Sequence, residues 1–480
     1  MTADLPPDQP ARLPQKLWPL GLLGAALVAL CWAHSNVYGD VYCAPYYMLG
    51  ILAGFLLLCA ALAYAAQPTT VRRERAVCGL VMIFALGARL PYLAKGPIRS
   101  SDVYRYMWDG KLQRRGINPY IYAPNDSRVK RYRTNYHQYI NNLGVKTLYP
   151  PTSELLFRLA AEVGEDSVVV YKSLFVLFDL GTTLVLFALF PLLRRPPSLA
   201  VLYAWNPLVI SEFAGNAHHD GLGIFFLTLA IYLTFRARGP EKELWPAAAL
   251  AVATMAKGYT IFLVPFVAQC RGFRFRSFLL WFGLVVLILL LPYAGAGRDL
   301  LSGLSEYSAR WERNDSLFYL ISNFLAYLIA DWRPVARVVV AGLLLSYTAL
   351  MGMSARREPA DSRAGDLEML RRGYYVMALF FFLNPTEYPW YLTWLVPLLA
   401  VYPHAGGLLL VAVVSYCYCT WAFNPADDWV RWIEYVPVYA LFLAQPLFDR
   451  LRARYPAPAA AYLTPAEPAP PSPCAPEPPA

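Results

Sequence analysis

The stretch YYMLGILAGFLLLCAALAYAA, residues 46 to 66, decides the fold class of this chain. None of its residues is charged, and its length matches the roughly 20 apolar residues that an α-helix needs to cross a bilayer. Similar apolar runs recur along the chain, most plainly GLLGAALVALCWA (21–33) and SFLLWFGLVVLILLLPY (277–293). The pattern predicts an all-α polytopic membrane protein.

Composition supports this class. Of 480 residues, 58% are hydrophobic and only 15% are charged, which is too little charge for a soluble domain of this length. The first apolar run has basic residues before it, as a signal peptide does, but no small-residue cleavage site and polar domain follow, so we expect a retained first helix. The eight Cys form no CxxC pair, so the sequence indicates neither a disulfide framework nor a zinc site.

The net charge of +10 is concentrated at the ends of the apolar runs, which fits membrane topology and predicts no nucleic-acid partner. The basic clusters are VRRER (71–75), RRPP (194–197), RARGPEK (236–242), RGFRFR (271–276), SARREP (354–359), LRR (370–372) and DRLRARY (449–455). The positive-inside rule places all of them in the cytoplasm. This requires 244–270 to be two short crossings with a break near Lys257-Gly258, and predicts about 14 transmembrane helices (12–14) with both termini cytoplasmic.

The same reasoning divides the chain into regions. We expect a cytoplasmic N-terminus (1–16), a transmembrane domain (17–455) and a disordered Pro/Ala-rich cytoplasmic tail (456–480). The transmembrane domain is expected to contain a large external loop (95–165) and a second external loop (294–330). Shorter external turns are expected at 216–220 and near 384–391 and 424–430.

The segment RSSDVYRYMWDGKLQRRGINPY (99–120) in the large loop brings acidic, basic and aromatic residues together. It predicts one helix over 102–115, with Ser101 or Asp102 as its N-cap and Gly116 at its end. Its apolar and aromatic flank, which is expected to lie in the headgroup layer as an interfacial helix, consists of Val103, Tyr104, Met107, Trp108 and Leu112. A second helix is expected after LYPPTSE (148–154), capped by Thr152 or Ser153.

Asp102 has two interpretations. Asp102, Arg105 and Asp109 share one helix face, so Asp102 can be a cap at the start of a salt-bridge ladder. It can also be a general base in a site on the external surface. The Tyr-rich and Arg-rich loop 121–147 is equally ambiguous, because such residues both bind sugars and lie well at a membrane interface.

The turn NAHHDG contains His218, His219 and Asp220. Consecutive residues of a helix point in different directions, so these three cannot bind one metal ion from a regular element. Asp220 can cap a helix that begins at Gly221, or the turn can contact substrate at an external helix end.

Lys257 lies near the midpoint of an apolar stretch, where a charge is costly and functional by default. It can bind a lipid-linked phosphate together with Arg298, Arg310 and Arg313 of the second external loop, or its chain can snorkel to the interface. In NPTEYPWYLTW (384–394), Glu387 and the surrounding aromatic residues can form either a substrate site or an ordinary aromatic belt.

Together these segments resemble a known family. SSD-V-Y-R-Y-x-W-D-G, GINPY and YPP resemble the first large external loop of GT-C superfamily membrane glycosyltransferases, closest to glycosyltransferase family 87 and the polyprenol-phosphomannose-dependent α-mannosyltransferases. The N-x-H-x-D turn and NPTEYPWYLTWLVPLL are also similar, and the likeness spans roughly residues 17 to 450. Many relatives have two adjacent acids in this loop, whereas this chain has Ser101 before Asp102, so a role that needs a pair of acids is not implied.

The resemblance implies transfer of a hexose, with mannose as the expected sugar, from a polyprenyl-phosphate sugar to a glycolipid or glycan acceptor, with inversion. The site would face the periplasm or exterior of the plasma (inner) membrane, without a cofactor or a required metal. Asp102 would be the catalytic base, with Asp109 as second choice, and the donor-phosphate residues would be Lys257, Arg298, Arg310 and Arg313. The expected substrate-binding residues are Arg105, Tyr106, Trp108, Asn118, Tyr120, Tyr149, His218, His219, Asp220, Glu387, Tyr388 and Trp390. The alternatives are a transporter or flippase of lipid-linked sugars and a glycan polymerase or ligase.

Overall fold

A computed structural model gives the fold, and it describes residues 16–37, 44–67, 70–239, 241–355, 363–421 and 429–454. In these residues the regular structure is helical, apart from one isolated β-bridge between Arg313 and Thr386. The expected N-terminal region and Pro/Ala-rich tail lie almost entirely outside the described residues, as do most of the 354–359 cluster and of the turn near 424–430.

The first ten α-helices are α1 (Trp18–His34), α2 (Ala44–Ala65), α3 (Val71–Leu93), α4 (Asp102–Arg114), α5 (Pro151–Gly164), α6 (Val168–Leu192), α7 (Val201–Ala204), α8 (Pro207–Ile210), α9 (Asp220–Arg236) and α10 (Leu244–Lys257). The others are α11 (Val264–Val267), α12 (Phe275–Leu290), α13 (Ser302–Arg310), α14 (Leu317–Leu328), α15 (Trp332–Ala355), α16 (Arg363–Leu383), α17 (Pro389–Leu392), α18 (Val396–Val401), α19 (Ala405–Val413) and α20 (Trp429–Arg454). Short 3₁₀ segments are η2 (Ser127–Tyr132), η3 (Asn135–Tyr139), η4 (Pro197–Ala200), η6 (Tyr259–Leu263), η7 (Cys270–Gly272), η8 (Leu291–Leu301), η9 (Thr393–Leu395) and η10 (Val414–Trp421), and η5 (Ser211–Gly215) is a π-helix.

Five helical segments are long and apolar enough to cross a membrane: Pro45–Ala65, Val71–Leu93, Val168–Leu192, Phe275–Arg310 and Trp332–Met353. In a bilayer, helices satisfy every backbone polar group internally, which explains why the apolar runs fold this way. The chain is therefore an all-α membrane protein, and the expected total of about 14 crossings stays a prediction. The expected break near Lys257-Gly258 is confirmed, because α10 ends at Lys257 and Gly258 has a left-handed φ of 78°.

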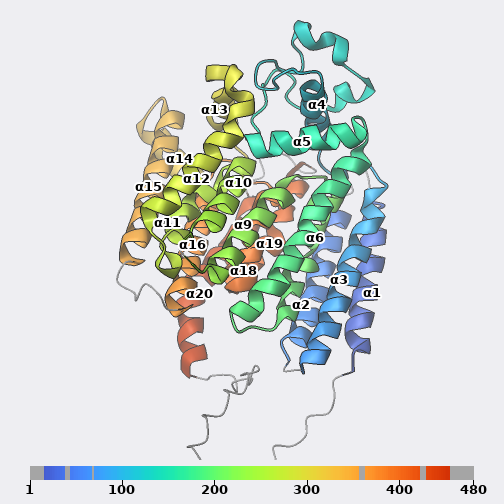
Figure 1. Cartoon of the computed structure of the whole chain (residues 1–480), viewed down its shortest axis with the longest axis vertical. Helices are drawn as coiled ribbons and strands as arrows, with labels where there is room; N and C mark the ends of the chain where they lie inside the picture. The colour runs from blue at the N-terminus through green and yellow to red at the C-terminus, as the bar shows by residue number, and fades with distance from the viewer. Residues whose placement is uncertain are drawn as a thin grey trace, which may run out of the picture.

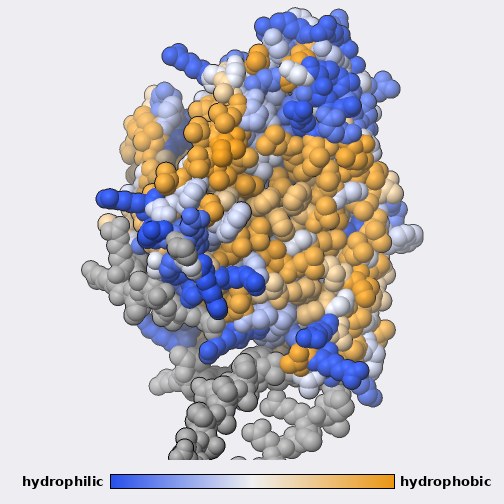
Figure 2. Space-filling view, viewed as in Figure 1, coloured by the Kyte–Doolittle hydropathy of each residue, from blue (hydrophilic) through white to orange (hydrophobic). Residues whose placement is uncertain are grey.

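The helices form a bundle with a polar cap at one end. Helices α4 and α5 and the loop between them lie across the upper end of the bundle in Figure 1. Figure 2 shows a broad band of hydrophobic surface between two hydrophilic ends. Such a band is the expected surface of a chain whose middle faces lipid tails.

The basic clusters meet at the end opposite the cap. Two contacts join pairs of clusters directly: Lys242 donates to the Arg271 carbonyl, and Arg371 pairs with Asp449. Ser198, next to the 194–197 cluster, donates from its backbone N to Glu74 Oε1 of the 71–75 cluster. The structure thus brings the described clusters to one end, as the positive-inside argument requires.

A buried ion pair fixes α3 against α6 inside the bundle. Arg89 Nε lies 2.5 Å from Asp179 Oδ2, and both side chains are fully buried. Arg89 also donates to the carbonyls of Ala85 and Ala204, at 2.8 and 2.9 Å. A charge in an apolar interior is tolerated only when it is paired and hydrogen-bonded, so this arrangement is specific to the observed packing.

Candidate active site

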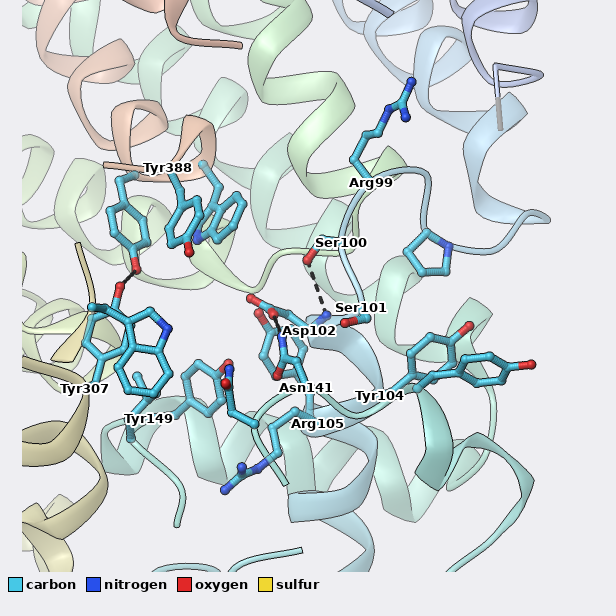
Figure 3. Close-up of a pocket in the computed structure, with 18 of the residues that line it drawn as sticks. Arg99, Ser100, Ser101, Asp102, Tyr104, Arg105, Asn141, Tyr149, Tyr307 and Tyr388 are labelled. Atoms are coloured by element: carbon cyan, nitrogen blue, oxygen red, sulfur yellow. Dashed lines mark hydrogen bonds between the residues drawn. The ribbon is translucent and has the colours of Figure 1, made fainter. Parts of the chain in front are cut away.

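A cavity of about 830 Å³ lies between the polar cap and the helical bundle. Its walls come from five segments far apart in sequence: the large loop, the end of α10, α13 with the residue after it, α17 with the residue before it, and η10 through Tyr418. Of the predicted site residues, it is lined by Asp102, Arg105, Tyr106, Tyr149, Lys257, Tyr388 and Trp390. In Figure 3, Asp102 lies near the middle of the cavity, with Tyr104 on one side and Tyr307 and Tyr388 on the other.

Asp102 is the first residue of α4, and its side chain is 18% exposed. Asn141 donates a hydrogen bond of 2.6 Å from Nδ2 to Asp102 Oδ1. Burial raises the pKa of the Asp102 carboxyl above its usual value, while the Asn141 hydrogen bond and the charge of Lys257 oppose that rise. A carboxylate with a raised pKa at the edge of a cavity has the protonation behaviour that a general base requires.

The interpretation of Asp102 as a cap at the start of a salt-bridge ladder is not supported. The N-cap residue Ser101 makes no side-chain cap hydrogen bond, and Arg105 pairs with Asp109 at 2.9 Å and forms no ion pair with Asp102. Only the second half of the expected ladder forms, so the described contacts leave Asp102 directed at Asn141 and His218.

Asp109 lies outside the cavity. Its two carboxylate oxygens accept from Arg105 Nε at 3.0 and 2.9 Å, and its side chain is 1% exposed. Burial raises the pKa of Asp109 and the Arg105 charge opposes the rise. Asp109, the second choice for the catalytic base, is therefore buried inside the cap.

The cap also corrects the expected setting of α4. The flank residues Val103, Met107, Trp108 and Leu112 are buried against the loop and α5, so the expectation that this flank lies in the headgroup layer is wrong. The long loop folds over α4 and takes the place of lipid. The expected cap of α5 is also wrong, because α5 begins at Pro151 and Ser153 Oγ donates instead to the Ala256 carbonyl at 2.8 Å.

His218 lies between two carboxylates. Its Nδ1 is 3.8 Å from Asp102 Oδ2, and its Nε2 is 3.5 Å from Glu212 Oε2. The ring stacks on Trp390 with centroids 3.9 Å apart, and Trp390 stacks on Tyr388 at 4.4 Å. The preceding residue, Ala217, has a left-handed φ of 62°, an unfavourable backbone conformation that is often retained at functional sites.

Lys257 is held at the cavity by Asp220. The Nζ atom of Lys257 lies 2.7 Å from Asp220 Oδ1 and 4.6 Å from the centre of the Tyr391 ring. The same Asp220 oxygen also accepts a hydrogen bond of 2.7 Å from Trp394 Nε1. The ammonium group of Lys257 is therefore paired inside the protein, and no side-chain cap hydrogen bond forms at the start of α9, where Asp220 lies. The buried ring of His219, next to Asp220 in sequence, makes edge-to-face contacts with the rings of Tyr106, Tyr149, Phe157 and Phe175.

The remaining predicted residues do not line the cavity. Arg298 and Arg310 are exposed on η8 and α13, and Arg313 lies in the β-bridge to Thr386. Asn118, Tyr120 and Trp108 pack within the cap region, and Glu387 is buried beside the α17 turn. Among the described residues, no group of three or more His, Cys, Asp or Glu is arranged to hold a metal ion.

Several lining residues were missed by the sequence reasoning: Arg99, Ser100, Tyr104, Tyr139, Asn141, Asn142, Tyr307, Trp311 and Tyr418. Arg99 and Ser100 could have been found, because they lie in the same quoted segment as Asp102. Glu212 was also missed, and its carboxylate accepts from Tyr418 and Asn216 next to His218. No local pattern marks Asn141 or Glu212, since long-range packing brings them to Asp102 and His218.

Comparison with known families adds a direct result. Residues 21–271 match the model of the MptA_B family, described as alpha-(1->6)-mannopyranosyltransferase, N-terminal domain. The matched residues include Asp102, His218 and Lys257. No curated protein matches the chain. Because the match covers more than half of the chain, the protein belongs to this family of alpha-(1->6)-mannopyranosyltransferases and is a membrane mannosyltransferase.

Proposed function

We propose that the chain transfers mannose from a polyprenyl-phosphate mannose to a hydroxyl of a glycan or glycolipid, at the extracytoplasmic face of the plasma membrane and with inversion at the anomeric carbon. The observation that carries the proposal is that Asp102 and Lys257 line the same cavity, at the end of the bundle opposite the basic clusters. A base and a cation in one site match the two charges that the reaction develops.

In the proposed reaction, the acceptor hydroxyl oxygen attacks the anomeric carbon and forms the new glycosidic bond. The bond from that carbon to the phosphate oxygen breaks, and its electron pair leaves with the polyprenyl phosphate. Asp102 takes the proton of the acceptor hydroxyl. Lys257 stabilises the charge of the departing phosphate, and Asp220 fixes the direction of its ammonium group.

The location of the cavity supports a lipid-linked donor. The cavity lies between the polar cap and the helical bundle. Figure 2 shows that the bundle surface below the hydrophilic cap is a hydrophobic band, so a phosphate attached to a membrane-anchored chain would lie near this boundary. If the basic clusters are cytoplasmic, the cavity opens on the other face, where nucleotide sugars are absent. The protein's own cation serves the monophosphate leaving group, so the proposal requires no metal and no cofactor.

The proposal is tested with the full chain reconstituted in nanodiscs, radiolabelled polyprenyl-phosphate mannose and an extracted glycolipid acceptor fraction. We expect labelled mannose in the acceptor fraction with this donor, and none with the nucleotide sugar GDP-mannose. Transfer from GDP-mannose alone would overturn the assignment of the donor. Transport of the intact lipid-linked sugar across vesicles without transfer would favour the flippase alternative.

A further inference from the structure

Asp102 lies between two cavity walls of different chemistry (Figure 3). One wall contains Tyr307, whose hydroxyl lies 2.6 Å from that of Tyr391, the ring over which the Lys257 charge lies. The opposite wall contains Tyr104, and Figure 3 shows this ring on the far side of Asp102 from Tyr307. The Asp102 carboxylate thus separates the wall that contains Tyr307, near Lys257, from the wall that contains Tyr104.

The proposed reaction assigns a different substrate to each wall. In an inverting displacement, the attacking oxygen and the leaving oxygen lie on opposite sides of the anomeric carbon. Lys257 marks the side of the leaving phosphate, so the acceptor occupies the side of Asp102 that faces Tyr104. Figure 3 shows the guanidinium groups of Arg99 and Arg105 directed away from Asp102.

Tyr104, Tyr136 and Tyr139 form a ladder of rings, of which Tyr104 and Tyr139 line the cavity. The Tyr104 ring lies 6.1 Å from Tyr136 in a stacked arrangement and 5.3 Å from Tyr139 on a tilt of 36°. Tyr136 is buried, whereas Tyr139 is 55% exposed and lies outside the packed core of the cap. One end of the ladder is therefore an exposed aromatic ring that lines the cavity.

The rim beside Tyr139 adds amide groups. Asn141 and Asn142 also line the cavity, and Asn142 has a left-handed φ of 50° that turns the loop at this point. An aromatic ring with a polar tip next to side-chain amides can pack on the apolar face of a sugar and hydrogen-bond its hydroxyls. A lipid tail would instead need a continuous apolar wall.

We infer that Tyr104, Tyr139 and Asn142 form an acceptor subsite that binds a second sugar unit, adjacent to the unit that carries the reacting hydroxyl. The inference rests on the proposed function for the position of the donor. It means that the acceptor is at least a disaccharide, and that a single sugar with its free hydroxyl fills only part of the acceptor side.

The test uses the full chain in nanodiscs and two variants, Tyr139→Ala and the control Tyr327→Ala. Tyr327 is 91% exposed and does not line the cavity, so its removal matches the loss of an exposed tyrosine. Binding of soluble α-1,6-linked mannobiose and of methyl mannoside is measured by saturation-transfer NMR, which needs no donor. The acceptor KM is measured separately in the transfer assay.

We expect mannobiose to bind more tightly than methyl mannoside, and Tyr139→Ala to raise the mannobiose Kd and the acceptor KM by about 3- to 10-fold, as for the loss of one aromatic contact. The kcat, the donor KM and the behaviour of Tyr327→Ala should stay unchanged. Equal mannobiose binding by Tyr139→Ala and the original chain would overturn the subsite. Failure of the proposed function gives a different result, namely absence of transfer with Tyr139-dependent sugar binding retained.

Discussion

The Nδ1 atom of His218 lies 3.8 Å from Oδ2 of Asp102, and the same ring stacks on Trp390 with centroids 3.9 Å apart. The separation from Asp102 is longer than a hydrogen bond, so the imidazole lies beside the carboxylate without bonding to it. A modest closure of the site would convert this approach into a hydrogen bond.

We therefore expect His218→Phe to keep the stack on Trp390 and lower kcat about 10-fold, through the loss of an interaction with a charged group. The transfer assay with saturating substrates measures this. The control is His137→Phe, which changes a cap histidine that packs on Trp108 away from the cavity. Equal kcat values for the two variants would contradict a role for the His218 nitrogens.

Lys257→Met should weaken the donor selectively. The substitution removes the ammonium group beside the proposed phosphate and leaves Asp220 without its ion-pair partner. We expect the donor KM to rise about 10- to 100-fold, as for a lost hydrogen bond to a charged group, with a smaller effect on the acceptor KM. Lys146→Met is the control, because Lys146 pairs with Asp299 outside the cavity. An unchanged donor KM in Lys257→Met would exclude this lysine from the phosphate site.

The pH profile depends on Asn141. A general base must be deprotonated, so kcat/KM should fall as the pH drops through the Asp102 pKa, which burial places above the usual carboxyl value. The Asn141 hydrogen bond favours the charged form and lowers this pKa. Asn141→Ala should therefore raise the pKa and move the acid limb of the profile to higher pH. A limb that stays in place, or moves to lower pH, would separate that limb from Asp102.

The fold should depend on the buried pair of Arg89 and Asp179. Arg89→Met leaves the Asp179 carboxylate buried without its partner, at a cost of about 3–5 kcal/mol. We expect a clearly lower Tm for the single variant in detergent and partial recovery in Arg89→Met/Asp179→Leu, in which neither charge remains. The same Tm for the original chain and the single variant would show that the pair does not hold α3 against α6.

Local sequence signals predicted the elements well where packing agrees with them. The helix expected over 102–115 is observed as Asp102–Arg114, and the break expected near Lys257-Gly258 lies at the end of α10. The first prediction rests on a local signal, namely end residues with Gly and Pro, and the second rests on the even number of crossings that the positive-inside rule requires between the basic clusters. The positive-inside argument also placed the described basic clusters together, because it depends only on charge at span ends.

Long-range packing explains what the sequence did not predict. Asp220 was expected as a possible helix cap, but Lys257 and Trp394 reach its carboxylate from distant segments. The apolar flank of α4 was assigned to lipid because nothing local shows that the following loop covers it. Arg310 looked like a phosphate ligand by its charge, whereas its side chain is paired with Glu306 at the surface.

The most direct measurement of the central claim is the transfer rate of Asp102→Asn, compared with Asp126→Asn as the matched change in a carboxylate of similar exposure (19%) that is paired with Arg128 and does not line the cavity. Both variants are reconstituted with labelled polyprenyl-phosphate mannose, and donor binding is measured in parallel. A general base contributes about 100- to 10,000-fold, so Asp102→Asn should lose transfer by that factor and retain donor binding, while Asp126→Asn transfers normally. Normal transfer by Asp102→Asn would contradict the assignment of Asp102 as the base, and Asp109→Asn would then be the next variant to measure.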